Sequence, residues 1–507
     1  MQGNIRKRIN ELSRPYIRHL SISDLPNELL LEVFNVFEYR FNPGPICRDW
    51  GTIFGWGRTR DISNIRLVCR RFHDVVSQKL IPIVTVKVND KSLTRLEKIS
   101  RHPIFAKSVR LVCVVPHFYN SAFADFNRFV SHYTAQLRAE ANDLDSRAIV
   151  YQDVHSSVIS ELVSNARAVA STLERFTSPA HSTGGEVEQY RTQVDEIHRE
   201  YVARLRNQEE LMTSGRFSRT IASAMTRMPG ARDLQFGSYD HCGELLGPGN
   251  IVWDAVFEFM RWPVHGTLAQ RDGLELPSYQ CLIHLMCTLQ HTGVSLNGIA
   301  IHLSPIRDPG SLVLSPDIRK QLSLGTQHLI NFQFTVPYRF QRATSNYTLG
   351  NDLNDFLSAC LDTSSLQDVR ISTGCYPSLF SAGVMKLGKV MGSRPREKLT
   401  RIFLDGPSVV DLSQLTDFLN ALPESMAHLH LATIHLWRGT WKQALDELRK
   451  KKYHIKNGIL RAPQGAECNY MSDGDVKKVF GTPYCHDHAS EADRYIVGQD
   501  PEQRNPL

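Results

Sequence analysis

The 507-residue sequence has no apolar run that approaches the roughly 18 residues of a membrane-spanning helix. Its first residues, Met-Gln-Gly-Asn-Ile-Arg-Lys-Arg, lack the apolar stretch of a secretory signal, so we do not expect secretion. Ten cysteines are too few for a disulfide framework in a chain of this length. We therefore expect reduced thiols in a cytoplasmic or nuclear protein. With 42% apolar and 22% charged residues, the composition also excludes global disorder.

Catalytic motifs are missing as well. The sequence contains no Gly-x-Ser-x-Gly, Walker loop, His-Glu-x-x-His or Cys-x-x-Cys. Cys485-His486-x-His488 and Cys468 are metal-ligand residue types, but their spacing matches no standard zinc framework. Cys281 and Cys287 fall in a helical pattern and are interpreted as small core residues. The sequence thus predicts a protein that is not an enzyme, with no catalytic residues, no cofactor and no metal.

The net charge of +7 is unevenly distributed. Residues 1–19 carry five basic residues against Glu11, and a second basic run occupies residues 449–452. A basic arm can bind nucleic acid, an acidic surface or an import receptor, or can be a solvated tail. Because the sequence has no RNP motif, C₂H₂ finger or helix-turn-helix pattern, we do not expect a nucleic-acid partner.

Two amphipathic segments lie near the N-terminus. The first, residues 23–37, begins with Asp24 and Pro26, which suit a helix start, and repeats apolar residues at helical spacing. The second, residues 61–76, repeats apolar residues in steps of three and four. Between them, residues 39–61 are rich in Pro, Gly and Trp and indicate an irregular loop.

The motif Leu-Pro-x-Glu-Leu-Leu-x-x-Val-Phe, followed by Ile-Arg-Leu-Val-Cys-Arg-Arg-Phe, resembles an F-box over residues 21–80. The resemblance implies a three-helix module that binds a Skp adaptor in a cullin–RING ubiquitin ligase. It departs from the family in its long insertion, residues 39–61, which can cap the module, change the adaptor contact or block it. The residues implied to face the adaptor, or to support that face, are Leu25, Pro26, Leu29, Leu30, Val33, Leu67, Val68, Cys69 and Phe72.

A template of three apolar residues, φ-x-x-φ-x-φ, recurs through the second half of the chain. Its middle residues are Leu234, Ile299, Phe332, Val369, Ile402 and Leu429, separated by 65, 33, 37, 33 and 27 residues. Two earlier strands are expected around Val84 and around Leu111–Cys113. Helical patterns alternate with these strands at Leu93–Ile99, Phe217–Met228, Tyr279–Leu289, Leu353–Leu361, Leu379–Val390 and Leu412–Leu422. The alternation predicts an α/β fold in the form of a β/α solenoid.

This repeat resembles irregular leucine-rich repeats, although the Asn or Cys that the family has at the ninth position is absent. A doubly wound α/β sheet, the fold of many enzymes, is the alternative, but no Gly-rich phosphate turn follows the strands. Residues 137–211 approximate a heptad seam with a break at residues 177–185, which predicts an inserted antiparallel helical hairpin that packs on the solenoid. A dimerising coiled coil is the alternative there.

If the repeats are real, the residues that flank each core pair point to a concave solvent face. The candidate target-binding residues on it are Gln235, His302, Gln333, Arg370, Arg401, His428 and His430. The expected organisation is a basic arm (1–20), F-box (21–80), first solenoid units (81–119), hairpin (120–215), solenoid (216–452) and polar tail (453–507).

The whole layout resembles fungal-type F-box proteins with degenerate leucine-rich repeats. This resemblance implies a non-catalytic substrate receptor that binds a Skp adaptor and, with it, a cullin, while the repeats hold a target protein. The alternative is a protein-binding scaffold whose divergent F-box no longer assembles a ligase.

Overall fold

The computed structural model describes residues 21–35, 56–116, 118–150, 156–177, 185–237, 253–261, 280–303, 312–335, 350–372, 385–391, 396–405, 408–450, 460–481, 490–498 and 504–507. The arm of residues 1–20, most of the 39–61 insertion, and Cys485, His486 and His488 lie outside these ranges.

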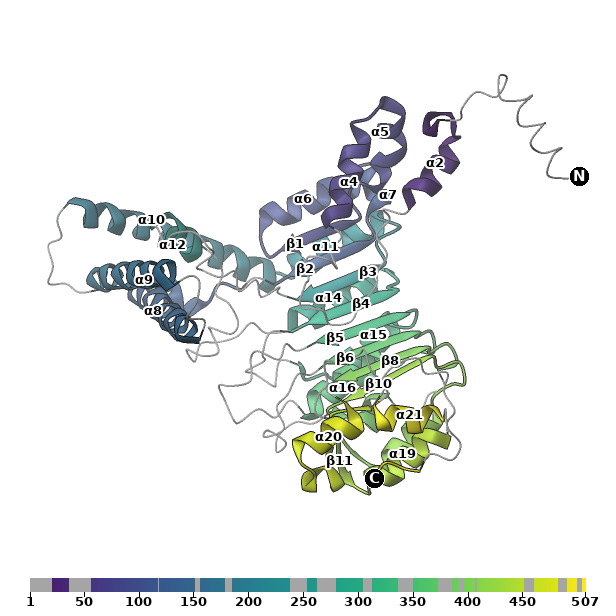
Figure 1. Ribbon diagram of the computed structural model, residues 1–507. Coiled ribbons are helices and arrows are strands. Elements are labelled where there is room, and N and C mark those ends of the chain that lie inside the picture. The colour runs from purple at the N-terminus through teal and green to yellow at the C-terminus, as the bar shows by residue number, and fades with distance from the viewer. Residues whose placement is uncertain are drawn as a thin grey trace, which may run out of the picture.

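A nine-stranded parallel sheet runs the length of the solenoid (Figure 1), with its strands in the order β1-β2-β3-β4-β5-β6-β8-β10-β12. All eight strands predicted from the apolar template are present. The strands are β1 (Ile83–Lys87), β2 (Leu111–Val115), β3 (Asp233–Gly237), β4 (Gly298–His302), β5 (Asn331–Thr335), β6 (Asp368–Ser372), β8 (Arg401–Asp405), β10 (His428–Ala432) and β12 (Leu460–Arg461).

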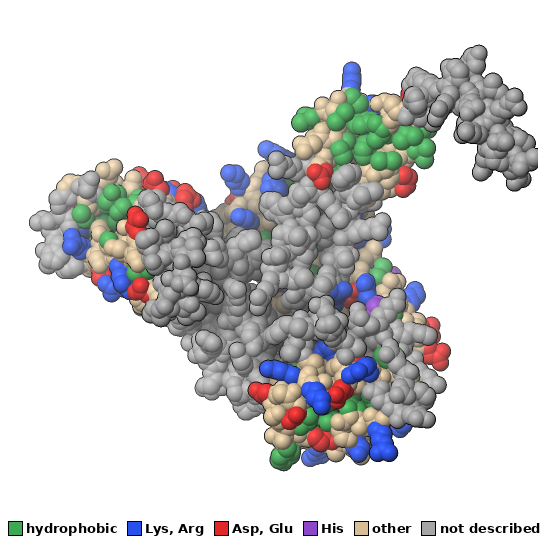
Figure 2. All heavy atoms as spheres, viewed as in Figure 1, with side chains coloured by type: hydrophobic (Ala, Val, Ile, Leu, Met, Phe, Trp, Pro, Cys, Tyr) green, Lys and Arg blue, Asp and Glu red, His purple; other side chains and the backbone are tan. Residues whose placement is uncertain are grey.

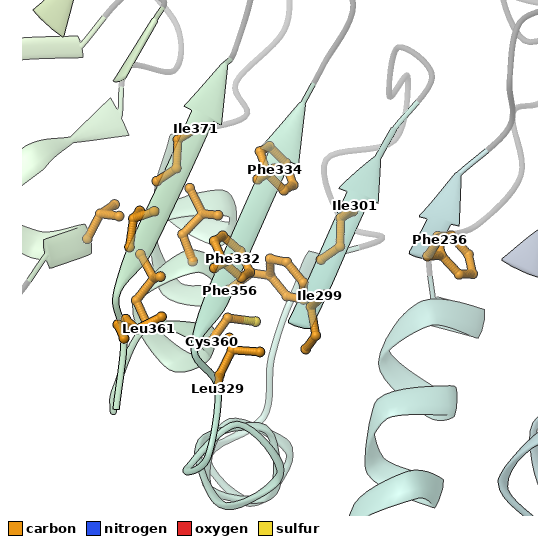
Figure 3. Close-up of a cluster of buried hydrophobic side chains, with 14 of the residues drawn as sticks. Phe236, Ile299, Ile301, Leu329, Phe332, Phe334, Phe356, Cys360, Leu361 and Ile371 are labelled. Carbon is orange, nitrogen blue, oxygen red and sulfur yellow. The ribbon is translucent and has the colours of Figure 1, made fainter. Parts of the chain in front are cut away.

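The register aligns equivalent template positions across the sheet. Ile299 pairs with Phe332, and Ile301 pairs with Phe334, so the apolar residues of successive strands form two continuous rows. These rows are buried, and Figure 3 shows Ile299, Ile301, Phe332 and Phe334 gathered with Phe356 from the helix layer. Burial of two aligned apolar rows is what fixes the register, because a shift of one residue would turn every apolar side chain to the opposite face.

The helices that connect the strands pack one against the next and form a single layer. They are α6 (Asp90–Arg101), α7 (Phe105–Ser108), α11 (Arg216–Arg227), α14 (Gln280–His291), α15 (Pro316–Gly325), α16 (Gly350–Cys360), α17 (Leu387–Met391), α18 (Leu412–Asn420) and α19 (Trp441–Lys450). A doubly wound sheet needs a point at which the strand order reverses, and the described strands follow sequence order throughout. The architecture is therefore a solenoid-like α/β fold.

A second, smaller parallel sheet was not predicted. Its strands are β7 (Met385–Lys386), β9 (Ser408–Asp411), β11 (His435–Arg438) and β13 (Gln464–Gly465), in the order β13-β11-β9-β7. Thr433 and Ala462 adopt φ of 56° and 41° where the chain turns from the large sheet into this one. The predicted helix Leu379–Val390 is corrected here, because its described part is β7 followed by α17.

A helical module projects from the N-terminal half of the solenoid (Figure 1). It consists of α8 (Phe126–Val150), α9 (Ser156–Phe176), α10 (Gly185–Thr213) and α12 (Trp253–Met260), with η4 (Ser121–Ala124) at its base. The prediction of a two-helix hairpin is thus wrong. The seam is divided among three helices, and α12 adds Val256, Phe257 and Met260 to the same core, which is separate from the solenoid core.

Three helices also form the N-terminal module: α2 (Asn27–Phe34), α4 (Trp56–Arg66) and α5 (Arg70–Val76), with η1 (Ile22–Asp24) and η3 (Ser77–Lys79) at its ends. The segment 61–76 was expected to be one helix, but it breaks between Arg66 and Arg70. The last residues of the expected 39–61 loop belong to α4. Leu30, Phe34, Ile62, Phe72, Val75 and Val76 form the core of this module.

The C-terminal segment is folded, in contrast to the polar tail expected for residues 453–507. Within its described residues it adds β12, β13, η8 (Ala466–Tyr470), α20 (Asp473–Phe480) and α21 (Glu491–Val497). Val479, Phe480, Tyr495 and Ile496 join the solenoid core, so this segment covers the last repeat. A solenoid needs such a cap because its terminal unit would otherwise expose one side of its core.

Gly237 at the end of β3 is expected to be sensitive to substitution. A Cβ atom there would lie 2.3 Å from the backbone oxygen of His302 on the neighbouring strand, whereas a Cβ at Gly388 in α17 would meet nothing within 4 Å. Gly237→Ala should lower the free energy of unfolding by about 1–3 kcal/mol. Gly388→Ala should leave it unchanged or raise it by up to ~1 kcal/mol. Urea denaturation followed by circular dichroism measures both, and equal effects would contradict the expectation.

Candidate functional site

Exposed apolar side chains gather on the N-terminal module. Figure 2 shows them as a green area over this module. Of the eleven large hydrophobic residues exposed in the described part of the chain, five belong here, and we call them the apolar patch: Ile22, Leu29, Val33, Leu67 and Val68. A soluble protein rarely exposes contiguous apolar surface without a binding role.

The most exposed members of the patch lie at the break between α4 and α5. Leu67 is 84% exposed and Val68 is 67% exposed. Their backbone N–H groups donate to the Asn64 and Ile65 carbonyls at 3.0 and 3.2 Å, which closes the last turn of α4. The Sγ atom of Cys69 then caps α5 by accepting a hydrogen bond from the Phe72 N–H at 3.4 Å. Both apolar side chains are therefore held outward by a hydrogen-bonded turn.

Arg71 joins the two halves of the module. Its guanidinium donates to the Asn27 side-chain oxygen at 2.9 Å and to the Ser23 carbonyl at 2.6 Å, and it also donates to the Leu25 carbonyl. Below these contacts, the Phe34 and Phe72 rings pack edge to face with centroids 5.3 Å apart. The patch residues on η1 and α2 are thereby fixed relative to those at the α4–α5 break.

The nine residues that the sequence assigned to the adaptor face divide into two groups. Pro26, Leu29, Val33, Leu67, Val68 and Cys69 are exposed, whereas Leu30 and Phe72 are buried in the core of the module and Leu25 is partly buried. The sequence reasoning missed Ile22 and the clamping role of Arg71. A charged residue next to the apolar Phe72, and far in sequence from its partners, gave no signal of that role.

The concave face of the sheet is less open than the sequence suggested. Gln235, His302 and Gln333 are buried, so these three candidates do not lie on an accessible surface. Arg370 and His430 are partly buried, and Arg401 and His428 are exposed. The sequence pattern shows which residues point away from the core, but not which of them other parts of the chain cover. The exposed candidates therefore lie on β8 and β10 only.

An ion cluster organises this end of the face. The side chain of Asp368 is only 1% exposed and lies 3.2 Å from the guanidinium of Arg370 and 3.0 Å from that of Arg401. On the adjoining strands, the rings of Phe403 and His430 stack with centroids 4.3 Å apart. The buried carboxylate holds Arg401 in place while 46% of the Arg401 side chain remains accessible to solvent.

Burial shifts the pKa values of two groups along the concave face in opposite directions. Desolvation lowers the pKa of His302 to about 4, so its imidazole is neutral at pH 7. Desolvation also raises the pKa of Asp233 to about 7, and the nearby positive charge of Arg110 offsets part of that shift. Neither residue lies beside a nucleophile that would give the shift a catalytic use.

Asp233→Asn should change how stability depends on pH. The unfolded carboxyl loses its proton near pH 3.8, whereas the folded carboxyl keeps its proton up to about pH 7. Ionisation of Asp233 therefore lowers the wild-type stability as the pH rises across this window, and the asparagine variant avoids that loss. The stability of the variant relative to wild type should grow between pH 4.5 and pH 8 in urea titrations. A difference that is independent of pH would contradict the assignment.

Among the described residues, no group of three or more His, Cys, Asp or Glu side chains could hold a metal ion. Cys281 and Cys287 are buried in α14, as the helical pattern predicted, and burial raises the pKa of the Cys281 thiol to about 12. Such a thiol is protonated and unreactive at neutral pH.

No protein-family model and no curated protein matches the sequence. Within the described ranges, no helix combines the length and the apolarity that a membrane span requires.

Proposed function

We propose that this protein is the substrate-recognition subunit of an SCF-type cullin–RING ubiquitin ligase. Its N-terminal module would be an F-box that binds the Skp adaptor, and its solenoid would be a divergent leucine-rich-repeat array that binds the target. The observation that carries this proposal is the apolar patch, which lies on a rigid three-helix module at positions given by the F-box resemblance.

The proposed activity needs no catalytic group in this chain. The adaptor and cullin bring the ubiquitin donor to the same assembly as the bound target. Holding a target lysine near that donor raises the effective concentration of the two reactants and makes the transfer effectively intramolecular. Arg401 and His428, the exposed candidates on β8 and β10, are the residues we assign to first contact with the target.

A non-ligase scaffold with a divergent F-box is the second candidate, and the 39–61 insertion is the feature that favours it. One experiment separates the two functions. The purified full chain is mixed with a purified Skp adaptor and analysed by size-exclusion chromatography with light scattering. The ligase function requires a 1:1 complex, and the absence of any complex at micromolar concentration would reject it in favour of the scaffold.

A further inference from the structure

The first repeats of the solenoid carry a dense positive charge. Residues 79–110 and 216–232 together contain twelve Lys and Arg against only two Asp and Glu, a net charge of +10 in a protein whose net charge is +7. All of these residues lie in described parts of the chain. The excess of positive charge over the folded body is therefore concentrated in one region.

The positive charge lies on the outer face of two adjacent helices. Leu93, Leu96 and Ser100 of α6 are buried, and Lys91, Arg95 and Lys98 form a row on the opposite, exposed side of the same helix. On α11, Arg216 and Arg219 are exposed and Arg227 is partly exposed. We call these six residues the basic face. Blue side chains are visible over α6 in Figure 2.

Hydrogen bonds and an ion pair hold the two helices side by side and in register. At their N-terminal ends Arg216 pairs with Asp90 of α6. At their C-terminal ends the guanidinium of Arg227 donates to the Ser100 hydroxyl at 3.0 and 3.1 Å. The two rows of cations therefore run parallel along a rigid pair of helices.

Both acidic residues of this region are already engaged. Asp90 pairs with Arg216, and Glu97 lies 3.8 Å from Arg101. Within the described part of the chain, Lys91, Arg95, Lys98 and Arg219 have no acidic partner. Like charges this close repel one another, and an anionic partner would remove that repulsion.

We propose that the basic face binds an acidic polypeptide segment of a partner protein, separately from adaptor binding at the apolar patch. The face belongs to the outer helix layer of the solenoid and carries no exposed aromatic ring on α6 or α11. A nucleic-acid duplex, itself convex, would meet such a layer over a small area and neutralise few phosphates, whereas an extended acidic segment can follow both rows of cations.

The test is binding of a fluorescent 20-residue peptide of Asp, Glu and Gly to the full chain, measured by anisotropy in low salt. We expect Lys91→Gln, Arg95→Gln and Lys98→Gln together to weaken binding about tenfold or more. The matched control removes three exposed lysines elsewhere, Lys320→Gln, Lys442→Gln and Lys477→Gln, and should change binding less than twofold.

Equal weakening by the two triple variants, or no binding by the wild type, would overturn the proposal. A 20-base-pair DNA duplex that binds more tightly than the peptide would reassign the face to nucleic acid. Light scattering at the same salt concentration completes the test, because dimerisation that the first triple variant abolishes would make a second copy of this chain the occupant.

Discussion

Replacing Leu67 and Val68 together by aspartate should abolish binding of the Skp adaptor without unfolding the protein. The two side chains are 84% and 67% exposed, so neither contributes much to the core of the module. Buried against a partner, each would contribute about 1.5–3 kcal/mol of apolar stabilisation. A carboxylate at either position would lose that contribution and add a desolvation cost. We expect an adaptor affinity reduced at least about 100-fold.

The controls separate binding from folding. Val313→Asp places the same charge on an apolar side chain that is 57% exposed, far along the chain from the module, and should leave adaptor affinity unchanged. The double variant itself should unfold within about 0.5 kcal/mol of wild type in urea. Leu30→Ala, in the buried core of the module, should instead cost about 2–5 kcal/mol of stability. Full adaptor binding by the double variant, measured by isothermal calorimetry, would remove the apolar patch from the interface.

Substitution at the helix break is sharper than substitution in the Leu-Pro motif from which the resemblance started. Leu25 is partly buried against the module core, and its carbonyl accepts a hydrogen bond from Arg71. A change at Leu25 would therefore disturb folding and binding together. Leu67 and Val68 make no such contribution to the core, so their substitution reports on the interface alone.

The large sheet could be predicted because its signal is strong and local. Two apolar residues in each strand, such as Phe332 and Phe334, point to the same core and repeat at nearly constant spacing. The second sheet gave no such signal, because strands such as β7 and β13 have only two residues each. Alternation cannot be recognised over two residues.

The candidate site was predictable in part for the same reason. Helical spacing identified the apolar residues of the N-terminal module, but the same spacing fits a residue that faces the core, such as Leu30, and one that faces solvent, such as Leu29. The concave face failed for a different reason. Gln235 and Gln333 point away from the core as predicted, yet their burial depends on segments distant in sequence, which periodicity does not report.

Asp493→Ala should have the largest effect on stability. Arg461 on β12 and Asp493 on α21 form an ion pair in which the side chains are 1% and 3% exposed. The same guanidinium donates to the Phe480 carbonyl at 3.2 Å and to the Ser490 hydroxyl at 3.3 Å. Removing the carboxylate would leave a buried cation without its counter-charge. Breaking a buried pair in this way costs about 3–5 kcal/mol.

Asp493 also stabilises α21 directly. Its carboxylate accepts a hydrogen bond from the Ser490 N–H at 2.9 Å, and the Ser490 hydroxyl accepts one from the Asp493 N–H at 3.1 Å. This reciprocal arrangement satisfies two donors at the start of the helix. Loss of the carboxylate should therefore loosen α21, which contributes Tyr495 and Ile496 to the solenoid core.

Three variants distinguish the buried charge from a general effect of truncation. Glu174→Ala breaks the exposed pair with Arg138, whose side chains are about half accessible, and should cost less than about 1 kcal/mol. Arg461→Met combined with Asp493→Leu removes both charges and should recover much of the stability lost in Asp493→Ala. If the double variant is instead less stable than Asp493→Ala in urea unfolding, hydrogen bonding rather than charge pairing holds the C-terminal cap on the solenoid.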